Sequence, residues 1–260
     1  MTPPTLPTLT WGSGDRRMLL LHGISASAAG WWRLGADLAD LGWEVTAPDL
    51  RGHGDAPKAK NYSIREHATD VLALGSRWDA VLGHSMGGAI AVLAASKAPG
   101  WTKRLVLQDP ALVAREPVEA TIDWLLDPYR RPLTSGQMAL DHPHWHPSDC
   151  ETRATALRRA GPDLITSTIK DSSPWNVIEE TAALTVPTTI IGSDPACGGI
   201  MARTIAGWLA DTNPLLNYVL LPGAEHSVHR DDRLYPEYFR IVREALDGMP
   251  TLRGGEEERA

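Results

Sequence analysis

The chain has 260 residues, 43% hydrophobic and 22% charged, which is enough apolar material for a packed core and excludes a disordered or fibrous chain. A formal net charge of -7, with no dense basic run, argues against nucleic acid as a partner. Two cysteines, Cys150 and Cys197, are too few for a disulfide framework and favour a reducing, cytoplasmic location.

The first residues, 1–9, alternate Thr, Pro and Leu and predict no signal peptide. Short apolar runs then alternate with longer amphipathic segments, the pattern of parallel strands joined by helices. In chain order the sequence predicts a strand at 17–21, a helix at 31–41, a strand at 44–47, a helix at 64–77, a strand at 80–83, a helix at 86–98, strands at 105–107, 188–191 and 218–221, and a helix at 234–246. The apolar runs are strand-sized and fall short of the ~20 residues that span a bilayer, so no membrane partner is expected.

The rhythm changes between residues 111 and 186, where seven prolines break the chain into short pieces. Strand-like runs resume at Thr188 in the earlier pattern, so we interpret this region as a helical cap inserted into one core rather than as a separate domain. The predicted division is a core of residues 1–110 and 187–247 and a cap of residues 111–186. The tail, residues 248–260, is predicted to be disordered.

The segment Gly83-His84-Ser85-Met86-Gly87 carries the strongest chemical signal. It matches the G-x-S-x-G nucleophile elbow and lies between a predicted strand and a predicted helix, as that motif requires. A serine in so tight a turn has a strained backbone, and the two glycines remove side chains that would collide across it. The bare pattern is weak, but this context makes it specific.

With this motif the chain resembles the α/β-hydrolase superfamily, and the resemblance extends from Leu19 to Leu246. Three further segments carry it in the family's order: Leu20-Leu21-His22-Gly23-Ile24, Pro48-Asp49-Leu50-Arg51-Gly52-His53-Gly54 and Gly223-Ala224-Glu225-His226-Ser227-Val228. The last departs from the family, which more often has Gly where this chain has Glu225. The resemblance implies an α/β-hydrolase fold with a mostly parallel, eight-stranded sheet flanked by helices and an inserted cap.

The resemblance also implies roles for individual residues. Ser85 is the expected nucleophile and His226 the general base that takes its proton. The backbone N–H groups of Ile24 and Met86 are the expected oxyanion hole.

Two aspartates are candidates for the acid that orients His226. Most of the superfamily has it after the seventh strand, where this chain has Asp194, one residue short of the usual register. The other site is the end of the sixth strand, where Asp109 lies 24 residues after Ser85. The register favours Asp109 slightly, and both remain candidates.

Tryptophans near these motifs and in the cap are candidates for the wall of a substrate pocket, although core packing is about as probable for each. Trp31 follows the oxyanion turn, and Trp145 and Trp175 lie in the predicted cap. His142, His144 and His146 alternate there, but the prolines between them favour an irregular loop over a zinc site. We therefore expect no metal and no cofactor.

These features predict a cofactor-free serine hydrolase that cleaves a carboxylic ester or lactone of a small to medium, largely apolar substrate. A carbon–carbon bond hydrolase or a haloperoxidase-like enzyme shares the same residues, so the fold alone does not decide the substrate. A receptor-like binding protein without activity is the rival from another class. A homo-oligomer is left open.

Overall fold

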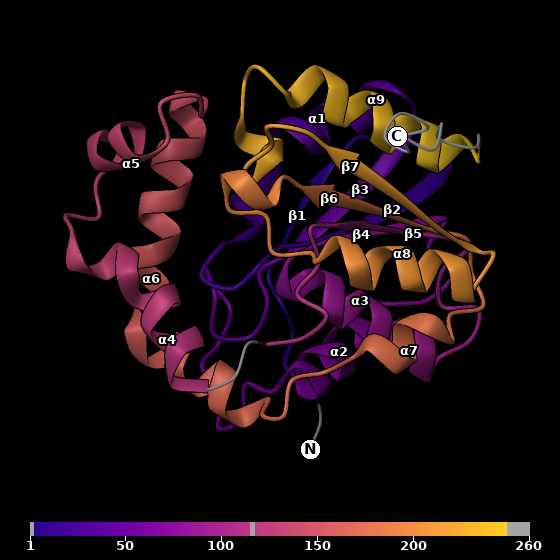
Figure 1. The fold of residues 1–260 in the computed structure, drawn as a ribbon, viewed down its shortest axis with the longest axis horizontal. Coiled ribbons are helices and arrows are strands. Elements are labelled where there is room, and N and C mark those ends of the chain that lie inside the picture. Colours follow the sequence, from indigo (N-terminus) through magenta and orange to yellow (C-terminus); the bar gives the residue numbers. More distant parts are fainter. Residues whose placement is uncertain (1–2, 115–117, 249–260) are drawn as a thin grey trace, which may run out of the picture.

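A single seven-stranded sheet organises the residues that the computed structural model describes, 3–114 and 118–248 (Figure 1). Its strands, in the spatial order β1-β3-β2-β4-β5-β6-β7, pair in parallel except for the antiparallel edge strand β1. They are β1 (Thr8–Trp11), β2 (Arg16–Leu21), β3 (Trp43–Pro48), β4 (Ala80–His84), β5 (Leu105–Gln108), β6 (Thr188–Ser193) and β7 (Leu216–Leu221).

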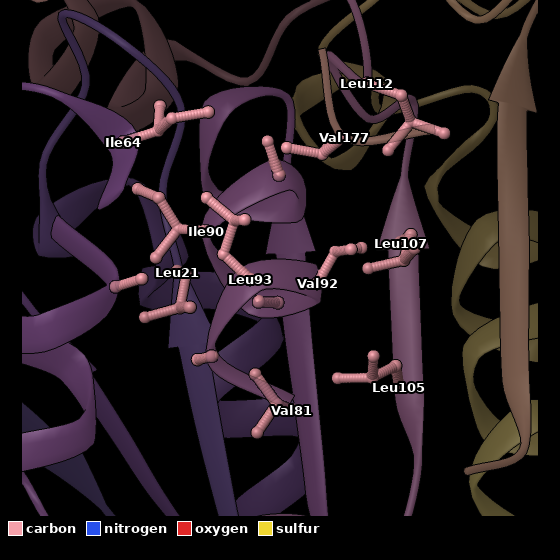
Figure 2. Packing of buried hydrophobic residues seen from close by; sticks show 14 of the residues in the cluster. Leu21, Ile64, Val81, Ile90, Val92, Leu93, Leu105, Leu107, Leu112 and Val177 are labelled. Carbon is pink, nitrogen blue, oxygen red and sulfur yellow. The ribbon is translucent and has the colours of Figure 1, made fainter. Parts of the chain in front are cut away.

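Helices cover both faces of the sheet, which explains why its strands are continuous apolar runs. On one face lie α1 (Trp32–Asp40) and α9 (Tyr235–Asp247), and on the other α2 (Ile64–Ala73), α3 (Met86–Lys97), α7 (Ile178–Ala182) and α8 (Arg203–Thr212) (Figure 1). Side chains of β2 alternate between the two faces: Leu19 and Leu21 pack toward α3, while Met18 and Leu20 pack toward α1 and α9. Figure 2 shows the first of these layers, with Leu21, Val81 and Leu107 of the sheet against Ile90 of α3.

The sheet has seven strands in the described residues rather than the eight expected. Residues 3–7, the described residues before β1, include Pro3, Pro4 and Pro7, which have no backbone N–H to donate to a sheet. Strand β1 and helix α8 were not predicted. The strand is a four-residue edge strand with three exposed residues, so it lacks the apolar run that signals a buried strand.

Among the described residues, four α-helices lie between β5 and β6 in sequence. Three of them, α4 (Val118–Leu126), α5 (Ser135–Asp141) and α6 (Pro147–Asp171), lie beside the sheet and its covering helices (Figure 1). Helix α6 bends at Gly161, which has φ 71° and precedes Pro162. The fourth helix, α7, packs with α3 and α8.

The division into a core and a 111–186 cap stays a prediction, and the predicted disordered tail lies outside the described residues from 249 onward. Within the described part of the chain, no helix combines the length and the apolar character needed to cross a bilayer.

Candidate active site

Ser85 lies in a sharp turn between β4 and α3. Its φ of 54° and ψ of -119° place a non-glycine residue in a conformation that costs about 1–3 kcal/mol. Neighbouring glycines make the turn sterically possible: a Cβ on Gly83 would lie 2.4 Å from the Gly87 carbonyl oxygen, and one on Gly87 would lie 2.2 Å from that of Leu21. The turn therefore holds Ser85 at the carboxyl end of β4, beside the N-terminus of α3.

His226 and Asp109 meet at the same edge of the sheet. Asp109 directly follows β5, His226 lies in the loop after β7, and His226 Nδ1 is 2.6 Å from Asp109 Oδ2. Because Nδ1 is engaged, Nε2 is the nitrogen that can exchange a proton with a group in the cavity. His226 and Ser85 both line that cavity, although no hydrogen bond joins Ser85 Oγ to the imidazole within residues 3–114 and 118–248.

The Asp109 carboxylate is fully buried and surrounded by donors. Its Oδ1 accepts hydrogen bonds from the backbone N–H groups of Ser193, at 3.2 Å, and Met201, at 3.0 Å, and its Oδ2 accepts one from that of Ile200 at 3.0 Å. Burial alone would raise the pKa of Asp109, but the hydrogen bond and charge of His226, with the backbone donors, outweigh it and lower the pKa. The carboxylate therefore stays ionised and favours the His226 tautomer with a proton on Nδ1.

Asp194, the other candidate acid, has backbone partners instead. Its Oδ1 accepts from Ala196 N–H at 3.0 Å and its Oδ2 from Gly223 N–H at 2.9 Å, and these bonds lower its pKa. Gly223 lies three residues before His226. Asp194 thus ties the end of β6 to the loop that carries His226, and within the described residues its hydrogen bonds do not include the imidazole.

The proposed oxyanion donors lie on either side of Ser85: Ile24 lines the cavity in the turn after β2, and Met86 opens α3. His22 holds the first of these turns. Its Nε2 accepts from Leu50 N–H at 3.0 Å, which leaves Nδ1 as the donor to the Gly23 carbonyl oxygen at 2.8 Å. Burial lowers the pKa of His22 to about 4, so the ring is neutral, as one donor and one acceptor require.

A cavity of about 340 Å³ lies over Ser85 and His226. Residues of the α4–α6 region form its opposite wall, among them Met138 and Trp145. The Trp145 ring stacks on that of His142 with 3.8 Å between centroids. This volume is at the small end of the range for ligand pockets.

Two tryptophans predicted to line the pocket, Trp31 and Trp175, lie outside the wall of this cavity. Trp31 is 1% exposed and packs with α1 and α9, its ring 4.6 Å from that of His229. Trp175 packs in the cluster around α3 and donates its Nε1–H to the Ala111 carbonyl oxygen at 2.8 Å. Both bury their large apolar area between the sheet and its covering segments.

The three alternating histidines have separate surroundings. His142 Nδ1 is 2.8 Å from Glu225 Oε2, and His146 accepts from Ser148 N–H at 3.1 Å at the start of α6. Among the residues described here, no group of three or more His, Cys, Asp or Glu side chains is arranged to hold a metal ion.

Sequence reasoning missed three arginines in the cavity wall, Arg153, Arg230 and Arg131. A signal for the first exists: Cys150, Ala154 and Leu157 are buried at helical spacing in α6, and Arg153 lies within that apolar stripe. Arg230 follows His226 by four residues and gives no comparable pattern.

Comparison with known proteins shows which proteins this chain is similar to. Lipase LipV of Mycobacterium tuberculosis is 36% identical to this chain over 119 residues, which are 42% of this chain and 45% of the lipase. The chain therefore matches less than half the length of that relative. N-formylmaleamate deformylase of Pseudomonas putida is 23% identical over 235 residues, or 86% of this chain and 87% of that protein.

Among solved structures, that of E-2-(acetamidomethylene)succinate hydrolase superposes with a TM-score of 0.79 at 22% identity, covering 94% of this chain and 96% of that one. At that identity the likeness shows the fold alone. Residues 16–146 match the family described as the alpha/beta hydrolase fold. The expected superfamily is thereby confirmed: this chain belongs to the α/β-hydrolase fold family.

Proposed function

We propose that this protein is a cofactor-free serine hydrolase that cleaves a carboxylic ester or lactone of a small substrate through an acyl-enzyme. The observation that carries the proposal is the 2.6 Å hydrogen bond between His226 and the buried Asp109, beside a strained serine turn that opens on the same cavity. Buried ionised carboxylates are costly unless they serve a partner, and here that partner is the imidazole.

In the proposed reaction Ser85 Oγ attacks the substrate carbonyl carbon while its proton passes to His226 Nε2. Asp109 stabilises the imidazolium through Nδ1–H. The backbone N–H groups of Ile24 and Met86 donate to the oxyanion. The imidazolium then returns the proton to the leaving alkoxide as the carbon–oxygen bond breaks, and water releases the acid by the same steps.

Labelling of the serine tests this proposal. A fluorophosphonate probe should modify Ser85, identified by mass spectrometry, and the purified chain should hydrolyse p-nitrophenyl butyrate. Ser85→Ala should lose the label and at least roughly 10³-fold of kcat/KM. Ser96→Ala, on an exposed residue of α3, is the matched control and should keep both. A Ser85→Ala variant that keeps a tenth of the activity, or a wild type without label, would refute the proposal and favour a binding protein.

A second candidate is hydrolytic removal of an N-formyl group by the same residues. It is favoured by the likeness to N-formylmaleamate deformylase, which extends over 86% of this chain. Release of formate from N-formylmaleamate, lost with Ser85→Ala, would select this reaction if p-nitrophenyl butyrate were a poor substrate.

A further inference from the structure

Two arginines in the cavity wall have no carboxylate within 4.0 Å among the described residues. The acidic residues of the cavity are Asp127, Asp141 and Glu225, and each binds another side chain of the cavity wall. Arg131 binds Asp127 at 2.8 Å and Asp141 at 2.6 Å, and His142 binds Glu225 at 2.8 Å. Two further cations remain in the wall.

Arg153 is the first. Its Nη1 donates to the Ser25 carbonyl oxygen at 2.7 Å and to Ser25 Oγ at 3.1 Å, and in the described residues no carboxylate oxygen lies within 4.0 Å of the guanidinium. Burial, with repulsion from Arg230, lowers the pKa of Arg153 to about 9, so the group is still charged at neutral pH. Its Nε–H and Nη2–H groups have no protein acceptor in the part of the chain that the structure describes.

Arg230 is the second, and it is 3% exposed. Its Nη1 donates to the Asp149 carbonyl oxygen at 3.3 Å, and its guanidinium lies 5.0 Å from the centre of the Trp145 ring. It too has no carboxylate within 4.0 Å among the described residues. The charge of Asp149 acts on it from a greater distance, and because burial raises the pKa of Asp149 to about 6, this carboxylate is ionised at neutral pH and partly compensates Arg230.

Arg153 has no carboxylate within 4.0 Å and no protein acceptor for its Nε–H and Nη2–H groups among the described residues, so this part of the cavity wall is complementary to an anion. The planar Arg fork fits a carboxylate by two parallel hydrogen bonds. We propose that the substrate carries a free carboxylate, which binds Arg153 with Arg230 behind it. This inference rests on the proposed serine hydrolase and names its substrate class.

The position of Arg153 limits the substrate further. Its partner Ser25 is the residue after Ile24, the proposed oxyanion donor, so the carboxylate and the scissile carbonyl bind close together. A cavity of about 340 Å³ leaves room for a small molecule only. The substrate class is therefore a short monoester of a dicarboxylic acid.

A matched pair of esters tests the preference. Monoethyl succinate and ethyl levulinate differ in a carboxylate oxygen replaced by a methyl group. The wild type should prefer the charged ester in kcat/KM. Arg153→Gln should reduce the ratio of the two kcat/KM values by roughly 10- to 100-fold, the range for a lost hydrogen bond to a charged group. Arg153→Lys keeps the positive charge but lacks the planar guanidinium, so its ratio of kcat/KM values should lie between those of the wild type and Arg153→Gln.

Arg158→Gln is the control, because it removes one positive charge from an exposed position of α6 outside the cavity. Its ratio should equal that of the wild type. If circular dichroism shows that Arg153→Gln is unfolded, the ratio measured for Arg153→Lys tests the inference instead. A ratio unchanged in Arg153→Lys, a ratio unchanged in a folded Arg153→Gln, or a wild type that prefers ethyl levulinate would each overturn the inference.

A binding measurement separates this inference from the proposed reaction. By calorimetry, glutarate should bind to Ser85→Ala, which has no nucleophile, and its affinity should fall at least roughly 10-fold in Ser85→Ala/Arg153→Gln. Glutarate bound by a protein that cleaves no ester would refute the hydrolase while supporting the carboxylate site. Turnover of ethyl levulinate without glutarate binding would do the reverse. Inorganic phosphate is the comparison ligand, and tighter binding of phosphate than of glutarate would overturn the carboxylate assignment.

Discussion

Asp109→Asn is the substitution that distinguishes the two candidate acids most directly. Asn has the same shape, but one carboxylate oxygen becomes an NH₂ group. If that group faces His226, Nδ1 must become an acceptor, the proton moves to Nε2, and the ring can no longer accept the proton of Ser85. If it faces the other way, it meets the backbone N–H groups of Ser193 and Met201, which now point at it from 3.2 Å and 3.0 Å.

The expected magnitude follows from these contacts. The wrong tautomer should lower kcat by roughly 10³ to 10⁴, equivalent to about 4–5.5 kcal/mol of transition-state stabilisation. The unpaired donor in a fully buried site should also lower the free energy of unfolding by about 1–3 kcal/mol. Asp194→Asn leaves the His226 tautomer alone and disturbs only the bonds to Ala196 and Gly223, so its kcat should fall no more than roughly tenfold.

The assay compares both variants with the wild type on p-nitrophenyl butyrate at saturating substrate, with unfolding in urea measured on the same samples. Circular dichroism ensures that each variant is folded under the assay conditions. A large loss in Asp194→Asn with a small loss in Asp109→Asn would refute the reasoning and make Asp194 the acid.

Three further predictions follow from packing and burial. Trp145→Ala should change the ratio of kcat/KM between short and long p-nitrophenyl esters. Trp175→Ala should leave that ratio unchanged and lower the free energy of unfolding by about 3–5 kcal/mol. Similar ratios in the two variants would contradict this. Gly87→Ala should lower the free energy of unfolding by about 3 kcal/mol or more, because the new Cβ would lie 2.2 Å from a backbone oxygen. Gly207→Ala, whose Cβ would have nothing within 4 Å, should be neutral or stabilising. Equal melting temperatures of the two variants would contradict this. Burial raises the pKa of Asp149 to about 6 in the folded state, above its unfolded value, so the folded state holds the proton more tightly and stability falls as pH rises from about 4 to 6. Asp149→Asn should remove about 2 kcal/mol of that fall between pH 4.5 and 7, measured by urea unfolding, and parallel pH profiles of variant and wild type would contradict this.

The sequence by itself determined the family and most of the sheet. Strands such as β2 and β4 are short, continuous apolar runs because helices cover both of their faces, and this pattern is local. The Ser85 turn is partly local: Gly83 is required by a contact with Gly87 within one strand, turn and helix, whereas Gly87 is required by its close approach to Leu21 of β2. Edge strand β1 was not predicted, because an exposed edge strand does not require a continuous apolar run.

Only the tertiary structure decided which side chains meet. Asp109 and Asp194 both follow strands at one edge of the sheet, and their spacing in sequence left them nearly equal. The difference arises from direction: Asp109 has a positive φ of 38° and turns its carboxylate to His226, while Asp194 binds the backbone of the loop before that histidine.

Tertiary packing also determined which residues line the cavity. Trp31 and Trp145 are alike as residues, yet one packs under a covering helix and the other faces the cavity, because burial depends on which elements fold over each. Arg153 and Arg230 are 77 residues apart and approach each other only because α6 folds over the loop after β7. Charges brought together from such separate segments leave no pattern along the chain, since their electrostatic interaction depends on distance in space.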